Sequence, residues 1–361
     1  MSPSNRTNPS PPAADVVVIG DGVIGLATAV AIARAGGSCR VVGRTITGAA
    51  SSASAGLLAP SIGRADQMFR SFMRASRDRY PAWIHWLAER TGVDVTLNRS
   101  GIIELGGSED AAPANDVERL DDRALHELEP TVTPGVAGLL YHDDGFVDNV
   151  RLLAALREAV RCEWSIEVAD GRVAAIEPGV DMCRVITEDG RAQHAPSVVL
   201  AAGAWSALVA GAPRIVPVEP VRGQMLQLAG CPLSRAVSSP DAYLVPRGDT
   251  TLVGSTLERV GFDSTTTGAA LDRLHAAAAA VVPSLGDAAV ERSWAGLRPM
   301  TPDGLPVIGR DPDLPTVVYA CGHGKNGILL APLTADCVAA IVEGREAPID
   351  IAPFGVHRFV E

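Results

Sequence analysis

The N-terminal stretch Asp15-Val-Val-Val-Ile-Gly-Asp-Gly-Val-Ile-Gly25 decides the fold of this chain. Its first five residues form a short apolar run, which is typical of a buried parallel strand. Its glycines have the spacing G-x-G-x-x-G, and an alanine-rich segment at 26–35 continues from them as an expected helix. A second apolar run at 38–42 completes a β-α-β unit. The pattern predicts a Rossmann-like α/β domain at the start of the chain.

The glycine motif predicts a site for the pyrophosphate of a dinucleotide. Gly20 makes the tight turn, Gly22 lets the backbone approach the phosphates, and Gly25 lets the helix and strand pack closely. The next residues, Val23 and Ile24, lie at the expected helix N-terminus, where free N–H groups and the helix dipole favour an anion.

The second strand lacks the acidic residue that usually binds the ribose hydroxyls of such a cofactor. Gly43 stands at that position, and Arg44 follows it. Two interpretations of Arg44 are open: it reaches the adenine ribose or a phosphate, or it is a solvated surface residue. The loss of a charged hydrogen bond, worth about 1.5–3 kcal/mol, predicts cofactor binding that is weaker than usual.

The rest of the chain has α/β texture in its middle and at its end, with antiparallel texture between them. We expect residues 107–117 to form a loop. The further expected helices are 64–91, 152–160, 271–282 and 326–343, and the expected strands are 101–106, 172–177, 183–187, 198–202, 223–228, 242–245, 251–255 and 316–321. This order predicts two domains whose segments alternate along the sequence.

Length and composition narrow the function classes. At about 150 residues per domain, 361 residues suggest two domains, and the net charge of −11 argues against a nucleic-acid or anionic-membrane partner. No run of eighteen apolar residues occurs, and residues 1–14 are expected to be a disordered leader without a signal-peptide core. None of the six cysteines has zinc-site spacing, so we expect free thiols, no metal and a cytoplasmic location.

Five segments, in order along the chain, resemble the D-amino-acid-oxidase-like FAD family, and within it the glycine oxidase branch. They are Ala50–Pro60, Val199–Ser206, Tyr243–Arg247, Ser293–Pro299 with Asp303-Gly304, and Gly322–Pro332. The resemblance implies a Rossmann-like FAD-binding domain interleaved with an antiparallel-sheet (α+β) substrate domain. We expect residues 15–80, 146–215 and 290–361 to form the first domain and residues 81–145 and 216–289 to form the second.

The same resemblance implies further contacts to non-covalent FAD, beyond the glycine motif and Arg44. They are Ser51, Ser52, Ala55, Gly56, Leu57, Val173, Ala202, Gly203, Trp205, His323, Gly324, Asn326, Gly327, Ile328 and Leu329. The helix that opens near Asn326 is expected to stabilise negative charge on the reduced flavin. No cysteine precedes Thr301 at the place where related enzymes attach FAD covalently, and Cys321 is expected to be a buried strand residue.

The family's activity would be oxidation of a small amino acid or amine at Cα. Hydride transfer from Cα to flavin N5 would give an imine, then an oxo acid with ammonia or an amine, while oxygen would be reduced to hydrogen peroxide. Glycine, sarcosine and small D-amino acids are the expected substrates, and the family often forms dimers or tetramers. Two alternatives remain open: a dehydrogenase that uses an acceptor other than oxygen, and a flavin-binding module without catalysis.

Three side chains are expected to bind the substrate carboxylate. Arg298 matches the family's arginine and can form two parallel bonds to a carboxylate, although a surface arginine is the plainer interpretation. Lys325 is the only lysine in the chain, in a glycine-rich loop where the family often has arginine, and a chance surface lysine is its alternative. Tyr243 would donate its hydroxyl, or else serve as a core aromatic residue. Near the pocket we also expect Leu257, Met300 and Asp241, the last of which is more simply a turn residue.

Overall fold

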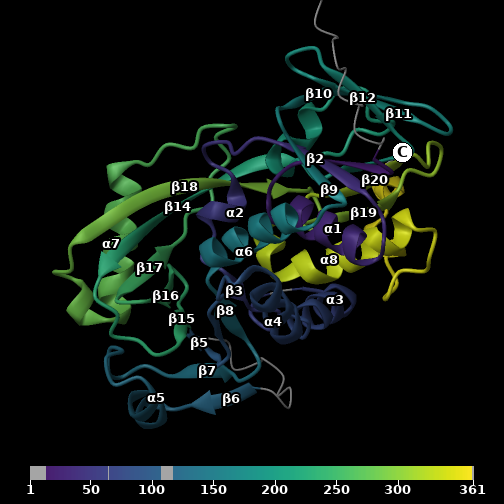
Figure 1. The fold of residues 1–361 in the computed structure, drawn as a ribbon. Coiled ribbons are helices and arrows are strands. Elements are labelled where there is room, and N and C mark those ends of the chain that lie inside the picture. Colours follow the sequence, from purple (N-terminus) through teal and green to yellow (C-terminus); the bar gives the residue numbers. More distant parts are fainter. Residues whose placement is uncertain (1–13, 64, 107–116, 360–361) are drawn as a thin grey trace, which may run out of the picture.

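A six-stranded, mainly parallel sheet forms the centre of one half of the molecule (Figure 1). The computed structural model describes residues 14–63, 65–106 and 117–359. The strand order is β19-β20-β13-β1-β2-β9, and only the β19–β20 pair is antiparallel. The strands are β1 (Val16–Ile19), β2 (Cys39–Gly43), β9 (Ile166–Asp170), β13 (Ser197–Leu200), β19 (Val307–Arg310) and β20 (Val317–Cys321).

Helices pack against this sheet and against one another around the largest hydrophobic core. α1 lies on α8 and α6, α3 packs on α8, and α4 packs on α6. The small residues of α1 let it approach α8 closely, because alanine and glycine place little side-chain bulk between the two backbones. The helices are α1 (Val23–Arg34), α3 (Gln67–Arg77), α4 (Tyr80–Thr91), α6 (Asn149–Cys162) and α8 (Gly327–Val342).

Helix α8 is also the most apolar helix of the chain. Within the described residues, the segment Gly324–Val342 is the one helix whose length and composition would suffice to cross a membrane, and 67% of it is buried inside the protein. Its packing on α1 and α3 accounts for that apolar composition. In this structure it is a core helix.

An eight-stranded sheet forms the other half, on the left in Figure 1, with helix α7 (Gly268–Val281) packed on it. Its order is β18-β14-β17-β16-β15-β5-β7-β6, and only the β15–β5 pair is parallel. The strands are β5 (Ile102–Leu105), β6 (Val117–Leu120), β7 (Gly138–Tyr141), β14 (Glu219–Ala229), β15 (Ala236–Ser238), β16 (Tyr243–Arg247), β17 (Thr250–Gly254) and β18 (Val290–Met300).

Two small antiparallel sheets and several short helices complete the described structure. The sheets are β10-β11-β12 and β3-β8-β4. Their strands are β3 (Leu57–Leu58), β4 (Leu97–Asn98), β8 (Gly145–Val147), β10 (Val173–Pro178), β11 (Cys183–Thr187) and β12 (Ala192–Ala195). The short helices are α2 (Ala50–Ala53), α5 (Asp122–Leu128), η1 (Gly203–Leu208), η2 (Pro283–Leu285), η3 (Gly324–Asn326), η4 (Ala352–Phe354) and η5 (Val356–Phe359).

The single helix predicted over 64–91 is wrong. The chain forms α3 and α4 instead, with a break at 78–79. Pro81 lies in the first turn of α4, where its missing N–H costs nothing, but within a continuous helix its ring would clash with the carbonyl of residue 77. Val117 begins β6 instead of ending a loop, and residues 107–116 and 1–13 of the expected loop and leader lie outside the described residues.

The topology bears on the proposed domain boundaries. β18 pairs with β14 along its whole length, so Val290–Met300 lies in the antiparallel sheet and not with the parallel one. α4 packs in the core that α1 and α8 share. We therefore propose that the first segment of the substrate domain begins after residue 91 instead of at 81, and that its second segment extends to about residue 300 instead of ending at 289.

Candidate active site

A cavity of about 690 Å³ lies between the two large sheets. On one side are the carboxyl ends of β1, β2, β13 and β20, and on the other are residues of β14, β16, β17 and β18. The carboxyl edge of a parallel sheet is where ligands bind in α/β folds. The cavity therefore joins a nucleotide-type site to the face of the antiparallel sheet.

The glycine motif forms one wall of the cavity. Gly20 has a φ of 118°, and a Cβ there would lie 2.4 Å from the Ala201 oxygen. A Cβ on Gly25 would lie 1.9 Å from the oxygen of Gly20, so both positions require glycine. Gly22, the N-cap residue of α1, has no side chain to cap the helix, and no acidic residue stands in the first turn. The helix N-terminus is thus open toward the cavity, and this cradle fits the pyrophosphate of FAD.

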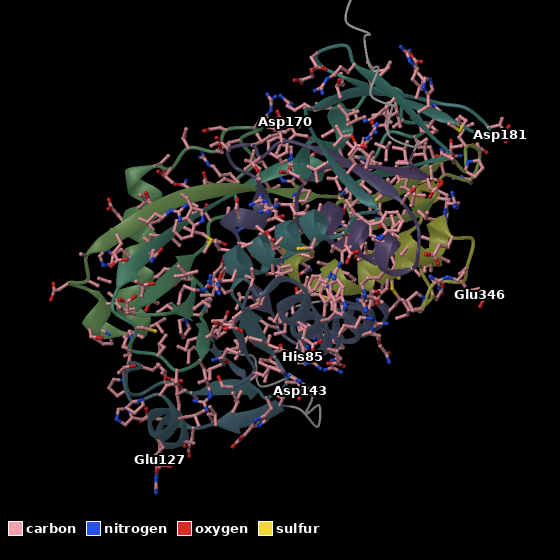
Figure 2. All side chains as sticks on the ribbon, in the orientation of Figure 1. His85, Glu127, Asp143, Asp170, Asp181 and Glu346 are labelled. Carbon is pink, nitrogen blue, oxygen red and sulfur yellow. The ribbon has the colours of Figure 1, made fainter. Side chains whose placement is uncertain are left out.

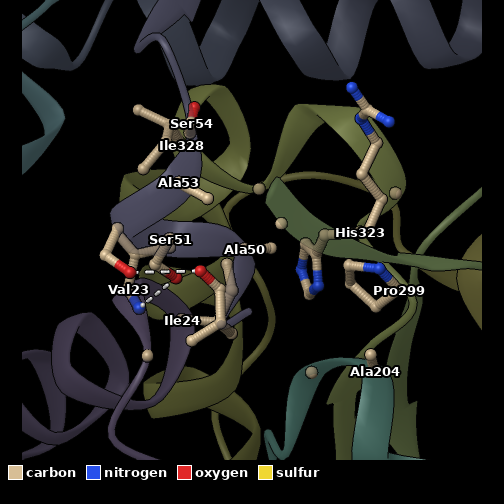
Figure 3. Close-up of a pocket in the computed structure, with 18 of the residues that line it drawn as sticks. Val23, Ile24, Ala50, Ser51, Ala53, Ser54, Ala204, Pro299, His323 and Ile328 are labelled. Atoms are coloured by element: carbon tan, nitrogen blue, oxygen red, sulfur yellow. Dashed lines mark hydrogen bonds between the residues drawn. The ribbon is translucent and has the colours of Figure 1, made fainter. Parts of the chain in front are cut away.

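The segment Ser51–Ala55 forms the neighbouring wall (Figure 3). The Val23 N–H donates to Ser51 Oγ at 3.0 Å. Side chains from three other elements bind backbone oxygens of this segment. The bonds are Asn149 Nδ2 to Ser51, Trp294 Nε1 to Ala53 and Arg247 Nη2 to Ala55, each 2.9 Å. These bonds fix the loop before any cofactor arrives.

Sequence reasoning assigned no role to these three side chains. Arg247 belongs to the quoted Tyr243–Arg247 segment, and its position four residues after Tyr243 was the available signal. It also pairs with Asp148 at 3.1 Å, and burial lowers its pKa from the ordinary value.

His323 lies at the opposite wall, beside Pro299 in Figure 3. It is buried, its Nε2 lies 3.2 Å from the Thr334 hydroxyl, and burial lowers its pKa to about 3. The ring is therefore neutral at physiological pH. Gly324, Gly327 and Ile328 line the cavity next to it, and helix α8 starts here without a capping side chain or an acidic residue in its first turn.

The three expected substrate residues all line this cavity. Arg298 Nη2 donates to Ser255 Oγ at 2.6 Å and Nη1 donates to the Thr256 oxygen at 3.0 Å, so its guanidinium has a fixed direction. Lys325 is exposed at the start of α8, and Tyr243 is half-buried on β16.

Both Arg298 and Tyr243 lie against glycines. A Cβ on Gly223 would lie 2.2 Å from Arg298 Nη2, and a Cβ on Gly254 would lie 2.6 Å from the Tyr243 hydroxyl. Because Gly223 and Gly254 have no side chains, space is left above the sheet at these two positions, and the polar ends of Arg298 and Tyr243 occupy it.

Most of the expected cofactor residues line the cavity as well. They are Gly20, Gly22, Val23, Ile24, Arg44, Ser51, Ser52, Ala55, Val173, Ala202, Gly203, Trp205, His323, Gly324, Gly327 and Ile328. Gly25, Gly56, Leu57, Asn326 and Leu329 are not among the lining residues of the described chain. Gly25 and Gly56 have supporting positions instead, since a Cβ on either would lie 1.9 Å from a backbone oxygen.

Of the three further residues expected near the pocket, two line the cavity and one does not. Asp241 and Leu257 line the cavity, and both are exposed. Met300 is not among the lining residues; its Sδ would lie 3.0 Å from a Cβ on Gly324.

The described residues offer little to a metal or a disulfide. No group of three or more His, Cys, Asp or Glu side chains in them could hold a metal ion. All six cysteines are free thiols, and burial raises the pKa of Cys321 to about 12. Cys321 is the buried strand residue that the sequence predicts.

Comparison with known proteins identifies the family. The model of the FAD dependent oxidoreductase family, DAO, matches residues 15–341. The chain belongs to this family. The predicted fold class, the FAD cofactor and the assignment to the FAD-dependent amino acid oxidases are confirmed.

Its relatives include glycine oxidases. The chain is 34% identical to a glycine oxidase of Pseudomonas putida, over 94% of this chain and 97% of that protein. The crystal structure of glycine oxidase from Geobacillus kaustophilus superimposes with a TM-score of 0.89 at 31% identity, covering 97% of this chain and all of that one. The chain is also 35% identical to the bifunctional protein ThiO/ThiG of Synechocystis, over 96% of its length, and it spans about half of that protein.

The buried histidine predicts an acid-sensitive fold for this oxidoreductase. Between pH 6.5 and 3, the unfolded chain binds a proton at His323 that the folded chain does not bind. The free energy of unfolding should therefore fall by about 1.4 kcal/mol per pH unit below pH 6.5 from this residue alone. His323→Asn should remove that part of the slope, as measured by urea unfolding between pH 7 and 5.

Comparing the wild type with His323→Asn cancels the contributions that other titratable groups make to the pH dependence of stability. Asp144, whose pKa burial raises to about 6, acts in the opposite direction and contributes equally to both proteins. Equal slopes in both would show that His323 is protonated in the folded state.

Proposed function

We propose that this protein oxidises glycine, sarcosine or a small D-amino acid at Cα and passes the electrons to oxygen. The products would be an imine, hydrolysed to an oxo acid and ammonia or an amine, and hydrogen peroxide. The convergence of Arg298, Tyr243 and Lys325 on the cavity that the glycine motif lines carries this proposal. The glycine oxidase relatives support the substrate class.

Arg298 would bind the substrate carboxylate. Its two bonds to Ser255 and Thr256 hold the guanidinium against Gly223, so the orientation that a carboxylate needs exists before binding. The Tyr243 hydroxyl, which lies against Gly254 and 3.7 Å from Met225 Sδ, would donate to the same carboxylate, because Tyr243 lines the cavity.

FAD, when bound, supplies a two-electron acceptor. The protein then has to orient Cα, keep the substrate amine neutral and stabilise negative charge that develops on the ring system. The uncapped N-terminus of α8 suits the last task, and the neutral His323 beside it adds no charge and takes no general-base role in this scheme.

A small substrate, non-covalent FAD and a cytoplasmic location are part of the same proposal. Ile62, Met225 and Tyr243 line the same cavity, and their bulk would favour a small side chain on Cα. The burial of α8 in the core is in keeping with a soluble protein.

Lys325 should tighten substrate binding through its charge. Lys325→Met should raise KM for glycine about twofold to fivefold and change kcat little, because an exposed ammonium contributes mainly long-range attraction. Lys325→Arg should stay close to the wild-type value. In the wild type KM should rise with salt, and in Lys325→Met this rise should shrink; an unchanged KM would remove Lys325 from the site.

Turnover in air tests the acceptor. The protein, saturated with FAD, is incubated with glycine, sarcosine, D-alanine and D-proline, and oxygen uptake, peroxide and ammonia or amine are measured. One peroxide per oxygen consumed is expected. Substrate oxidation without oxygen uptake, seen only with an artificial acceptor, would favour the dehydrogenase alternative.

A further inference from the structure

The end of β2 carries no acid, although a carboxylate there usually binds the adenosine ribose of the cofactor. Gly43 occupies the position. The following inference concerns only FAD binding and rests on the family's cofactor, independently of the substrate proposed above.

The side chain of Asp21 occupies the space that a side chain at position 43 would take. A Cβ built on Gly43 would lie 2.7 Å from Asp21 Cβ and 3.1 Å from Asp21 Cγ. Asp21 is the residue between the first two glycines of the motif, and both Asp21 and Gly43 line the cavity. A carboxylate thus lies in the loop beside the end of β2, although none stands at the end of the strand itself.

A chain of hydrogen bonds orients this carboxylate. The Thr45 hydroxyl donates to Asp21 Oδ2 at 3.1 Å, and Arg157 Nη2 on α6 donates to Thr45 Oγ1 at 3.3 Å. Among the described residues, no hydrogen bond engages Asp21 Oδ1, so one oxygen stays available to a ligand. Thr45 and Arg157 also line the cavity.

The charged neighbours Arg44 and Asp170 are paired with each other. Arg44 donates to both oxygens of Asp170, at 3.0 and 3.3 Å, and this ion pair is at the surface with side chains 57% and 73% exposed. Asp170, labelled in Figure 2, ends β9 and is not among the cavity-lining residues of the described chain. The pair thus supports the interpretation of Arg44 as a surface residue.

We propose that the Asp21 carboxylate binds the hydroxyls of the adenosine ribose of FAD, in place of the absent acid at position 43. A carboxylate accepts hydrogen bonds from two adjacent hydroxyl groups and repels a phosphate at either. Gly43 is part of the same arrangement, because any Cβ there would displace the Asp21 side chain.

The test is FAD binding to the apoprotein, measured by calorimetry. Asp21→Asn should raise the Kd for FAD about tenfold to a hundredfold, the effect of losing a charged hydrogen bond. Asp170→Asn is the matched control: it removes the same charge from the adjacent strand and should change the Kd less than twofold.

A second ligand shows whether the effect goes through the ribose. An FAD analogue with 2′-deoxyadenosine lacks one hydroxyl and should bind the wild type at least tenfold more weakly than FAD. Asp21→Asn should bind both ligands about equally, since the two deletions remove the same contact. Persistent discrimination in Asp21→Asn, or an unchanged FAD Kd, would overturn the proposal. A wild-type protein that binds no FAD would overturn the cofactor itself, and neither result bears on which amine is oxidised.

Discussion

Arg298→Ala should abolish turnover while FAD stays bound. The substrate carboxylate would lose a guanidinium that two hydrogen bonds already hold in place, and among the described residues no second arginine lines the cavity from the antiparallel sheet. Truncating one partner of a hydrogen-bonded charge pair costs about 2–5 kcal/mol, so kcat/KM should fall roughly thirtyfold to a few thousandfold. The Kd for FAD should change less than threefold.

The control for this variant lies on the same strand. Arg292 is exposed on β18, stacks over Trp294 and does not line the cavity in the described chain. Arg292→Ala should keep near-normal kcat/KM, and Arg298→Lys should recover part of the lost activity. Full turnover in Arg298→Ala would place the carboxylate site elsewhere.

Gly25→Ala should give a protein that neither retains FAD nor folds stably. The added Cβ would lie 1.9 Å from the oxygen of Gly20, where the backbone of the motif cannot yield without moving α1 off β1. Overpacking of this kind costs about 1–3 kcal/mol when side chains relax, and a rigid backbone contact belongs at or above the upper end. The expected readouts are a colourless protein after FAD addition and a lowered midpoint of urea unfolding.

Gly268→Ala is the matched control for the glycine substitution. It lies at the start of α7, and no atom comes within 4 Å of a Cβ built there. This change should be neutral or slightly stabilising, because alanine restricts the unfolded chain. A fully yellow and stable Gly25→Ala protein would contradict the packing role of the third glycine.

Local pattern predicted the parts of the fold that local forces determine. The apolar run before the glycines, the glycine motif and the alanine-rich helix are adjacent in sequence, and β1, α1 and β2 form as expected. The break between α3 and α4 was missed because the apolar pattern continues through Pro81. The pairing of β18 with β14 was missed because some sixty residues separate the two strands and their register depends on the whole sheet.

Prediction of the site likewise succeeded for features carried by a local segment and failed for contacts between distant segments. Arg298, Tyr243 and Lys325 were predicted because each stands in a segment that resembles the family, and all three line the cavity. The roles of Asn149, Trp294 and Arg247 were not found, since each bonds a backbone oxygen far away in sequence. Asp21 was overlooked for another reason: the glycine motif leaves that position unspecified, and only the space above Gly43 points to the role proposed for it.

Anaerobic reduction of the bound flavin tests the central claim most directly. The FAD-loaded protein is mixed without oxygen with glycine, sarcosine, D-alanine or D-proline, with L-alanine for comparison, and its visible spectrum is followed. We predict that at least one of the first four bleaches the flavin band in the wild type and not in Arg298→Ala. A yellow protein that dithionite bleaches and none of these compounds does would contradict the assignment as an oxidase of small amino acids.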